Sequence, residues 1–410
     1  MLGKEGALCA ACKGVRRLCG RPVCPILERI RHGAKALSAH RGRELFGATP
    51  PSVLVGEWGY PKVRVGLNVP PAGKEEAPIY DDPEGWWGRL GLEDVIRLRS
   101  HLFYSSTLAD VRIPYKSRLI GEIQEAALSS TPVDTEVLFK KPPRVELRFD
   151  GFLAPRGPHG VVEKLKVVDN PRVHRAVDRL VDDTDAPAQV AVGELYRAGV
   201  STYYITRIFS LGLLGRPYAR RIVPTRWAIT AVDKAVGDQL LEKVRDMPEL
   251  GEYEVYRVEY MGNRYSILLA PGLWSMEMVE IWLPRSVWVK GRQPAVFTVH
   301  ELYDGRLRGP MDGGYYAMRL PVLEHLCSRG RQATVIAVRE VTPDYYAPVG
   351  SWQIRESVRH ALRGKPERFS SLEEALRALF KGIETSAELA VKEAKLLRLM
   401  KGQKKLLEYL

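Results

Sequence analysis

Residues 216–233 read RPYARRIVPTRWAITAVD, and the rest of the chain can be organised around this stretch. Pro224 followed by Thr225 is typical of a helix start, and the apolar spacing that follows predicts a helix from Thr225 to about Val244. Before and inside the first turn of this helix the sequence concentrates arginines and aromatic residues: Arg216, Tyr218, Arg220, Arg221, Arg226 and Trp227.

This concentration favours a surface that binds nucleic acid. An arginine guanidinium is a fixed positive fork that suits phosphate, and an aromatic ring offers a face on which a base can stack. The predicted nucleic-acid-binding residues are Arg216, Arg220, Arg221, Arg226 and Trp227. The alternative is an ordinary solvated helix face, with Trp227 packed into the core.

The overall composition points in the same direction. The chain of 410 residues carries 62 Lys and Arg against 49 Asp and Glu, a net charge of +13. Such a balance favours a polyanionic partner, nucleic acid first and an acidic membrane surface second. The hydrophobic content of 45% is that of a soluble globular protein. The sequence contains no uncharged run of about 18 apolar residues, so no membrane span is predicted. The N-terminus lacks the apolar core of a signal peptide, and a cytoplasmic protein is therefore expected.

Four of the five cysteines lie in a short N-terminal segment, with the spacing C-x2-C-x6-C-x4-C. They are Cys9, Cys12, Cys19 and Cys24. Four thiolates at this spacing predict one tetrahedral Zn²⁺ ion, and because no ligand position stays open the zinc would be structural and not catalytic. The alternative is a pair of disulfides, which occur in the cytoplasm of hyperthermophiles. Cys327 lies far away and is predicted to be a buried apolar residue.

Strands and helices are predicted without regular alternation, which favours an α+β fold. Alternating valines on both sides of GEWGYP (residues 56–61) predict a β-hairpin within residues 49–71. A second hairpin is predicted over residues 252–269, with its turn at Gly262–Asn263. Further strands are predicted at 144–150, 278–290, 295–303 and 333–341. Helices are predicted at 26–46, 91–106 and 115–130, around 190–198, and from Ser370 onward, where Ser370 and Glu373 have capping-box spacing.

The chain is too long for one ordinary core, so two mixed α+β domains are expected, with an N-terminal zinc knuckle and a helical C-terminal end. The predicted run of strands is interrupted between the two domains, at Pro284, Gly291 and Pro294. The predicted segments are a four-cysteine zinc-binding segment at 1–30, an N-terminal domain at 31–285, a C-terminal domain at 286–400 and a tail at 401–410.

Acidic residues gather at Asp182, Asp183 and Asp185. Clustered carboxylates can bind Mg²⁺ for phosphoryl chemistry. The favoured interpretation is helix capping, because an apolar-periodic helix follows at once. The isolated residues His159 and His174 are expected to be structural or solvated.

The chain ends in QKKLLEYL, residues 403–410. Gln403, Leu406, Tyr409 and Leu410 fit the pattern Gln-x-x-aliphatic-x-x-aromatic followed by an apolar residue. This segment resembles the peptide by which DNA repair and replication proteins bind the sliding clamp PCNA, although Leu410 stands where a second aromatic residue is usual. The alternative is the plain end of an amphipathic helix.

Taken together, these motifs resemble the Nre family of archaeal DNA repair proteins. The resemblance rests on CAAC and CGRPVCP at the N-terminus, PPSVLVGEWGYPKVRVG at 50–66, RRIVPTRWAITAVD at 220–233 and the clamp-binding tail. It implies an archaeal cytoplasmic protein with an N-terminal zinc-binding segment, a smaller C-terminal domain and a role in DNA damage repair linked to PCNA. It implies no catalytic residue, and none is assigned here.

Three functions stay open on the sequence. The first is a DNA-binding repair protein that is recruited by the sliding clamp. The second is a metal-dependent enzyme acting on damaged DNA or nucleotides, for which Asp150, Asp182, Asp183 and Asp233 are the candidate carboxylates. The third is an RNA-binding or RNA-processing protein.

Overall fold

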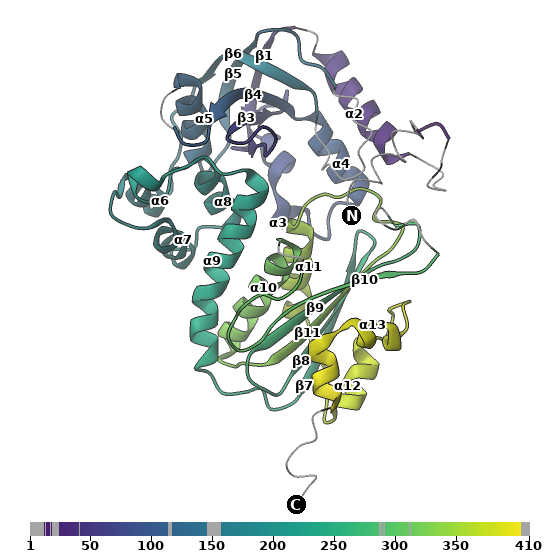
Figure 1. Ribbon diagram of the computed structural model, residues 1–410. Helices are drawn as coiled ribbons and strands as arrows, with labels where there is room; N and C mark the ends of the chain where they lie inside the picture. The colour runs from purple at the N-terminus through teal and green to yellow at the C-terminus, as the bar shows by residue number, and fades with distance from the viewer. Residues whose placement is uncertain are drawn as a thin grey trace, which may run out of the picture. The chain divides into compact units, whose positions relative to one another are not determined.

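The computed structural model describes residues 12, 14–16, 18, 24–40, 42–113, 117–145, 157–286, 289, 292–310 and 313–402. The chain forms two compact units (Figure 1). Unit 1 contains Met1–Val236 with Ala347–Val349, and unit 2 contains Gly237–Tyr346 with Gly350–Leu410. The expected α+β class is confirmed, because each unit combines a six-stranded sheet with helices.

The sheet of unit 1 has the strand order β1-β5-β6-β4-β3-β2. All neighbours are antiparallel except β4 and β6, which run parallel. The strands are β1 (Glu44–Thr49), β2 (Val53–Val55), β3 (Lys62–Val69), β4 (Phe103–Asp110), β5 (Val133–Phe139) and β6 (His159–Val167).

The hairpin predicted around GEWGYP is confirmed as β2 and β3. These strands pair antiparallel, with Val53 opposite Leu67 and Val55 opposite Val65. The alternation that predicted β3 reflects its two faces, since Val63 and Val65 are buried whereas Lys62 and Arg64 are exposed. The pattern therefore fixed both the hairpin and the side of the sheet that meets solvent.

The helices of unit 1 are α2 (Pro25–Ala39), α3 (Pro83–Trp86), α4 (Leu92–His101), α5 (Arg118–Leu128), α6 (Arg175–Asp182), α7 (Ala188–Arg197), α8 (Thr202–Ser210) and the first part of α9 (Thr225–Arg245), with short 3₁₀ turns η1 (Ala77–Asp81) and η2 (Pro217–Ala219). The helices predicted at 115–130, at 190–198 and from Thr225 are confirmed.

The helix predicted over 91–106 was wrong in its second half. Helix α4 ends at His101, and Phe103 begins the buried strand β4. The run Phe103-Tyr104-Ser105-Ser106 is buried throughout, in a strand that lies between β3 and β6 and is covered there on both faces of the sheet. Continuous burial has no alternating signature, so periodicity could not separate it from the helix before it. Most of the strand predicted at 144–150 lies outside the described residues, which stop at Val145 in this region.

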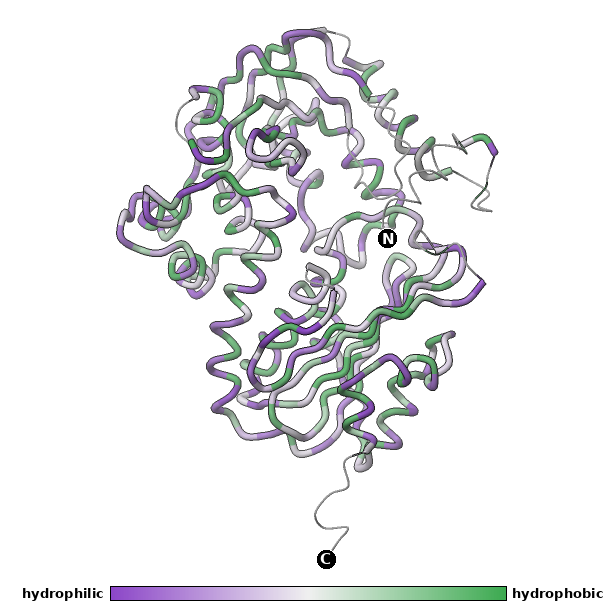
Figure 2. Tube along the Cα trace, viewed as in Figure 1, coloured by the Kyte–Doolittle hydropathy of each residue, from purple (hydrophilic) through white to green (hydrophobic). Residues whose placement is uncertain are grey.

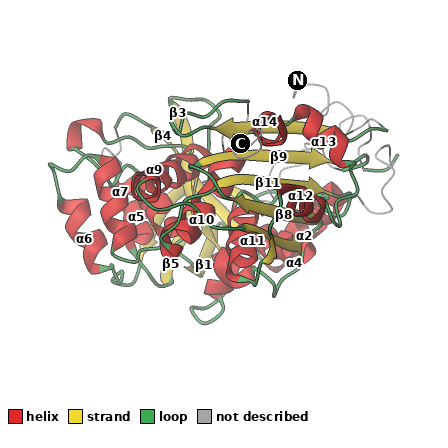
Figure 3. Ribbon diagram, turned by 90° about the horizontal axis from the view of Figure 1, so that it is seen from below, coloured by secondary structure: helices red, strands yellow, loops and turns green. Residues whose placement is uncertain are grey.

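The sheet of unit 2 has the order β10-β9-β11-β8-β7-β12. Strands β9 and β11 run parallel and the other neighbours antiparallel, and Figure 3 shows β9, β11 and β8 side by side. The strands are β7 (Tyr253–Tyr260), β8 (Asn263–Ala270), β9 (Ser275–Trp282), β10 (Ala295–Glu301), β11 (Thr334–Val341) and β12 (Glu367–Phe369). The hairpin predicted over 252–269 is thus confirmed as β7 and β8.

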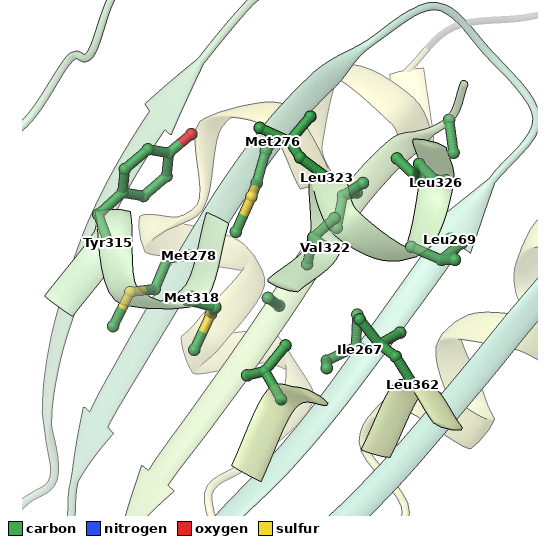
Figure 4. Close-up of a cluster of buried hydrophobic side chains, with 14 of the residues drawn as sticks. Ile267, Leu269, Met276, Met278, Tyr315, Met318, Val322, Leu323, Leu326 and Leu362 are labelled. Carbon is green, nitrogen blue, oxygen red and sulfur yellow. The ribbon is translucent and has the colours of Figure 1, made fainter. Parts of the chain in front are cut away.

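Helices cover both faces of this sheet. Helices α10 (Gly313–Arg329) and α11 (Trp352–Arg363) pack on one face, and α12 (Leu372–Leu379), α13 (Ala387–Glu393) and α14 (Lys395–Gly402) on the other. Figure 4 shows Tyr315, Met318 and Val322 of α10 against Met276 and Met278 of β9. The central strands β8 and β9 are therefore buried on both faces, and in Figure 2 the tube is mostly green, the hydrophobic colour, along these strands.

The predicted helical C-terminal end is confirmed, with a shift of one residue at its start. The N-cap of α12 is Ser371 and not the predicted Ser370, since the Ser371 hydroxyl accepts a hydrogen bond from the Glu374 amide at 3.3 Å. Cys327, predicted to be buried, is half-buried against the core of unit 2.

The compact units divide at a different place from the predicted domains. The division falls inside α9, between Val236 and Gly237, whereas the predicted boundary lay between residues 285 and 286. Strands β9 and β10 stand on either side of residue 285 and are neighbours in one sheet.

Within the described residues, no helix combines the length and apolar character that crossing a membrane would need.

Candidate nucleic-acid interface

The residues of the arginine-rich stretch have different environments. Helix α9 begins at Thr225, and the segment before it runs across unit 1 with its backbone held at two points. The Ile222 amide donates to the Val111 carbonyl at 2.9 Å, and the Val223 amide donates to the Ser210 carbonyl at 2.8 Å. These bonds fix the path of the backbone just before α9.

Arg220 is an internal anchor, which differs from its predicted place on a binding surface. The residue is 8% exposed. Its guanidinium donates to the Gly215 carbonyl at 2.6 Å, the Val181 carbonyl at 2.7 Å and the Asp183 carbonyl at 3.0 Å. These bonds fix the turn between α6 and α7 to the arginine-rich stretch. A guanidinium held in this way is not presented to a phosphate.

Arg216, Tyr218 and Arg221 are exposed, as predicted for a binding surface. The Arg216 guanidinium donates to the Asp185 carbonyl at 3.0 Å and the Tyr218 hydroxyl at 3.2 Å, and the bond to Tyr218 raises the pKa of Arg216. Arg221 donates to the carbonyls of Tyr218 and Arg220. The hydrogen-bond partners of both arginines are carbonyl and hydroxyl oxygens, and the charge of Asp185 acts on Arg216 in addition.

The turn between β2 and β3 lies against the start of α9. The Val55 amide donates to the Thr225 hydroxyl at 2.8 Å. The rings of Tyr60 and Trp227 lie 5.5 Å apart between centroids, tilted by 41°. Because these contacts join residues about 170 positions apart in sequence, they bring the GEWGYP turn and the arginine-rich stretch to one place on unit 1.

Large aromatic rings are exposed at this place. Trp58 is 76% exposed, Tyr60 54% and Trp227 47%, and Tyr218 of the neighbouring stretch is 73% exposed. Single exposed apolar residues are common on protein surfaces, whereas several large rings gathered in one region indicate a binding surface. Trp227 is therefore not packed into the core, as the alternative interpretation of the sequence required.

Exposed cations belong to the same elements as the rings or adjoin them in sequence. Arg226 lies 3.6 Å from the Glu57 carboxylate with its side chain 80% exposed, a pair too solvated to hold the charge tightly. Lys62 and Arg64 of β3 are exposed, and no carboxylate among the described residues forms an ion pair with either. Arg112 donates to both carboxylate oxygens of Asp110, and these bonds hold the pKa of Asp110 well below its usual range.

We call this region the loop–helix surface; it consists of Trp58, Tyr60, Lys62, Arg64, Arg112, Arg226 and Trp227. Arg226 and Trp227 were predicted for this role, whereas the other residues were missed. The signal for the turn residues was present in the sequence, because an aromatic pair inside a glycine-containing turn has no core to enter. The signal for Lys62 and Arg64 was their alternation with buried valines.

The acidic cluster has a local structural role. The Asp183 carboxylate accepts hydrogen bonds from the amides of Ala186 and Asp185, at 2.9 Å and 2.8 Å, and these bonds lower the pKa of Asp183. It thus closes the turn between α6 and α7, and the favoured interpretation as a cap of α7 was wrong, because the N-cap position of α7 is Pro187, which makes no side-chain hydrogen bond to the helix. Asp233 is buried in α9, and Asp150 lies outside the described residues.

Both histidines considered from the sequence are engaged in local contacts. The His174 ring accepts a hydrogen bond from the Ala176 amide at the start of α6. The His159 ring lies 2.7 Å from the hydroxyl of Ser106 and stacks on Tyr104. Ser106 is fully buried, whereas His159 is half-buried.

Two of the four N-terminal cysteines fall within the described residues. Cys12 is buried, and its carbonyl accepts hydrogen bonds from the amides of Val15 and Arg16, which makes a tight turn. Cys24 is half-buried and precedes α2 as its N-cap residue. Cys9 and Cys19 lie outside the described residues, and within the described part of the chain no three His, Cys, Asp or Glu residues are grouped to hold a metal ion.

The predicted clamp-binding residues also lie outside the described part. Helix α14 ends at Gly402, and Gln403, Leu406, Tyr409 and Leu410 follow it. The tail pattern therefore stays a prediction from sequence.

Fold and surface together define a basic α+β protein of two units whose exposed rings and cations suit a polyanion. The chain belongs to the archaeal Nre family: the N-terminal region of archaeal Nre matches residues 18–289, and the C-terminal region matches residues 301–409.

Relatives in this family have names that state a role. The chain is 37% identical to the DNA repair protein NreA of Archaeoglobus fulgidus over 379 residues, which is 92% of this chain and 94% of the relative. It is 38% identical to NreB of the same organism over 370 residues, or 90% and 91%. Identity to the DNA repair protein NreA of Haloferax volcanii is 36% over 346 residues, 82% of each chain. No solved structure matches the chain.

Proposed function

We propose that this protein is an archaeal DNA repair protein that binds DNA through the loop–helix surface. The observation that carries the proposal is the exposure of Trp58, Tyr60 and Trp227 beside cations that lack strong carboxylate partners. DNA is a polyanion with aromatic bases, so both parts of this surface match it chemically. The names of the relatives support DNA repair as the setting.

The cations carry the non-specific part of the affinity. Each phosphate that a lysine or arginine neutralises releases a counterion, which lowers the slope of log K against log salt by about 0.7–0.9. A variant with Lys62→Ala, Arg64→Ala and Arg226→Ala should therefore lose about two units of this slope, with weaker binding at low salt. Fluorescence anisotropy of a labelled oligonucleotide at several salt concentrations measures both quantities.

Unit 2 offers a matched control for this experiment. Lys365, Arg377 and Lys381 are exposed there, and Arg377 forms a solvated ion pair with Glu373 that resembles the pair of Arg226 with Glu57. Replacing all three with alanine removes the same charge from the chain. If this control variant and the loop–helix variant bind DNA equally well, the proposed surface is not the binding site.

We also propose that the sliding clamp PCNA recruits this protein through Gln403, Leu406, Tyr409 and Leu410. The support is the sequence pattern at the end of the chain, directly after α14. A pull-down with purified clamp should succeed with the full chain and fail after deletion of residues 403–410, and Tyr409→Ala should weaken it strongly because the aromatic plug is lost. Clamp binding by the truncated chain would overturn this part of the proposal.

A further inference from the structure

We propose that the loop–helix surface is a stacking platform for unpaired bases, so that the preferred ligand is single-stranded DNA or DNA with unpaired bases. This inference rests on the proposed function and names the substrate class of the same site. It assigns Trp58 and Tyr60 of the GEWGYP turn, with Trp227 of α9, as the residues that contact bases.

The three rings are partly exposed to solvent, so that a base can reach them. Tyr60 and Trp227 lie 5.5 Å apart at 41°, a tilted arrangement in which neither ring fully covers the other. About half of each residue is exposed to solvent. Trp58, two positions before Tyr60 in the same turn, is the most exposed of the three. The platform thus combines a ring pair with a further ring beside it.

The backbone of the turn is fixed before any ligand arrives. The Gly56 amide donates to the Arg64 carbonyl at 2.8 Å, the Lys62 amide to the Gly59 carbonyl at 2.9 Å, and the Val111 amide to the Pro61 carbonyl at 2.9 Å. Gly59 has φ +85°, and a Cβ there would lie 2.7 Å from the Lys62 carbonyl oxygen, so the turn requires glycine. A fixed turn lowers the entropy that binding must overcome.

Exposed rings distinguish unpaired from paired nucleic acid. In a duplex the faces of the bases are covered by their neighbours, so a protein reaches phosphates, sugars and base edges. In a single strand the faces are free, and aromatic side chains stack on them without regard to sequence. A surface that needed to bind only duplex phosphates would have no use for three exposed rings.

Cationic side chains lie near the rings in sequence and can bind the phosphates of a DNA single strand. Lys62 and Arg64 continue from the turn along β3, and Arg226 adjoins Trp227 at the start of α9. Cations beside stacking rings can hold the backbone of a strand while its bases lie on the aromatic side chains. Both elements that carry the ring pair, the turn before β3 and the start of α9, thus also carry cations, which agrees with a strand that crosses the platform.

The test compares two ligands of equal length, a labelled thymidine oligonucleotide and a blunt-ended duplex, with a uridine oligonucleotide as a third arm. The full chain is expected to bind the single strand more tightly than the duplex at the same salt concentration. Trp58→Ala, Tyr60→Ala and Trp227→Ala should each weaken single-strand binding by about five-fold to 100-fold, and duplex binding by less than about two-fold.

Two sets of variants make the loss specific. Trp58→Phe, Tyr60→Phe and Trp227→Phe keep a ring and should retain most of the affinity. Phe297→Ala removes an exposed ring from unit 2 and should change nothing. Stacking also quenches tryptophan fluorescence, and the part of the quenching that oligonucleotide binding causes should shrink in Trp58→Phe and Trp227→Phe.

The outcomes separate this inference from the proposed function. If the ring variants bind the single strand normally while the Lys62, Arg64 and Arg226 variant binds weakly, the surface binds phosphates and the platform is overturned. Equal losses for single strand and duplex would overturn it as well. If neither the alanine variants of the three rings nor the Lys62, Arg64 and Arg226 variant changes DNA binding, the proposed site itself is wrong. Tighter binding of the uridine strand would overturn DNA in favour of RNA.

Discussion

Arg220 is the residue whose role changes most between sequence and structure. Its guanidinium donates to the carbonyls of Val181 and Asp183 at the α6–α7 turn and to the carbonyl of Gly215. Arg220→Ala should lower the free energy of unfolding by about 1–3 kcal/mol, because buried carbonyl oxygens lose their donor. Arg221→Ala, at an exposed position, should stay within about 0.5 kcal/mol of the wild type.

Urea-induced unfolding of both variants checks this difference. The denaturant midpoint should fall for Arg220→Ala at an unchanged slope. Equal midpoints for the two variants would show that the Arg220 hydrogen bonds contribute little. The sequence could not separate the two arginines, because two of the three carbonyls that bind Arg220 belong to Val181 and Asp183, about 40 positions away, which the fold brings next to it.

His325 of α10 should make the free energy of unfolding depend on pH. Burial lowers the pKa of His325 to about 4, with the Arg329 charge acting in the same direction. Its ring lies 3.4 Å from the Tyr256 hydroxyl. The unfolded chain binds a proton on this histidine below about pH 6.5, whereas the folded chain resists it, so stability falls as the pH drops from about 6.5 towards 4.

His325→Gln should remove this part of the pH dependence. Between pH 7 and pH 4.5 the wild type should lose on the order of 2 kcal/mol more than the variant in the free energy of unfolding. Parallel curves for the two proteins over this range would contradict a depressed pKa. The comparison between variants is needed because carboxylates begin to titrate at the acid end of the range.

At the scale of elements, a buried glutamate of the unit 2 sheet, Glu277, binds the start of helix α14. The Glu277 carboxylate of β9 accepts hydrogen bonds from the amides of Lys395 at 2.8 Å and Leu397 at 3.1 Å, at the start of α14. Burial raises the pKa of Glu277, while these amides act in the opposite direction. An acidic group at a helix N-terminus also interacts favourably with the helix dipole.

Glu277→Ala should therefore loosen α14 in particular. Amide hydrogen exchange in residues 395–402 should accelerate by about ten-fold or more, with little change in β7 and β8. Glu373→Ala, at an exposed position in the first turn of α12, is the matched control. Acceleration spread evenly over unit 2 would mean that Glu277 supports the whole core and not the helix start.

Elements were predicted from sequence where one face meets solvent or a turn residue is diagnostic. The β2–β3 and β7–β8 hairpins and the start of α9 at Thr225 belong to this group. Strand β4 was missed because it is buried throughout its first half. Five of the seven residues of the loop–helix surface were missed for another reason: nothing in the sequence tells which distant turn lies against the start of α9.

At the scale of the whole molecule, we propose that Cys9, Cys12, Cys19 and Cys24 hold one structural Zn²⁺ ion. Cys12 at a tight turn and Cys24 before α2 suit such a knuckle, in which a metal would supply the folding energy of the segment. Elemental analysis of the purified chain should find about one zinc per molecule, and Cys12→Ser or Cys24→Ser should abolish it. A metal-free chain whose stability falls on reduction would favour the two disulfides instead.

The most direct test of the central claim is hydrogen exchange of the full chain with and without a thymidine oligonucleotide. If the loop–helix surface binds DNA, protection should concentrate in residues 56–64, 110–112 and 221–227, where the turn, the end of β4 and the start of α9 meet. Protection confined to unit 2, with these three segments unchanged, would contradict the account.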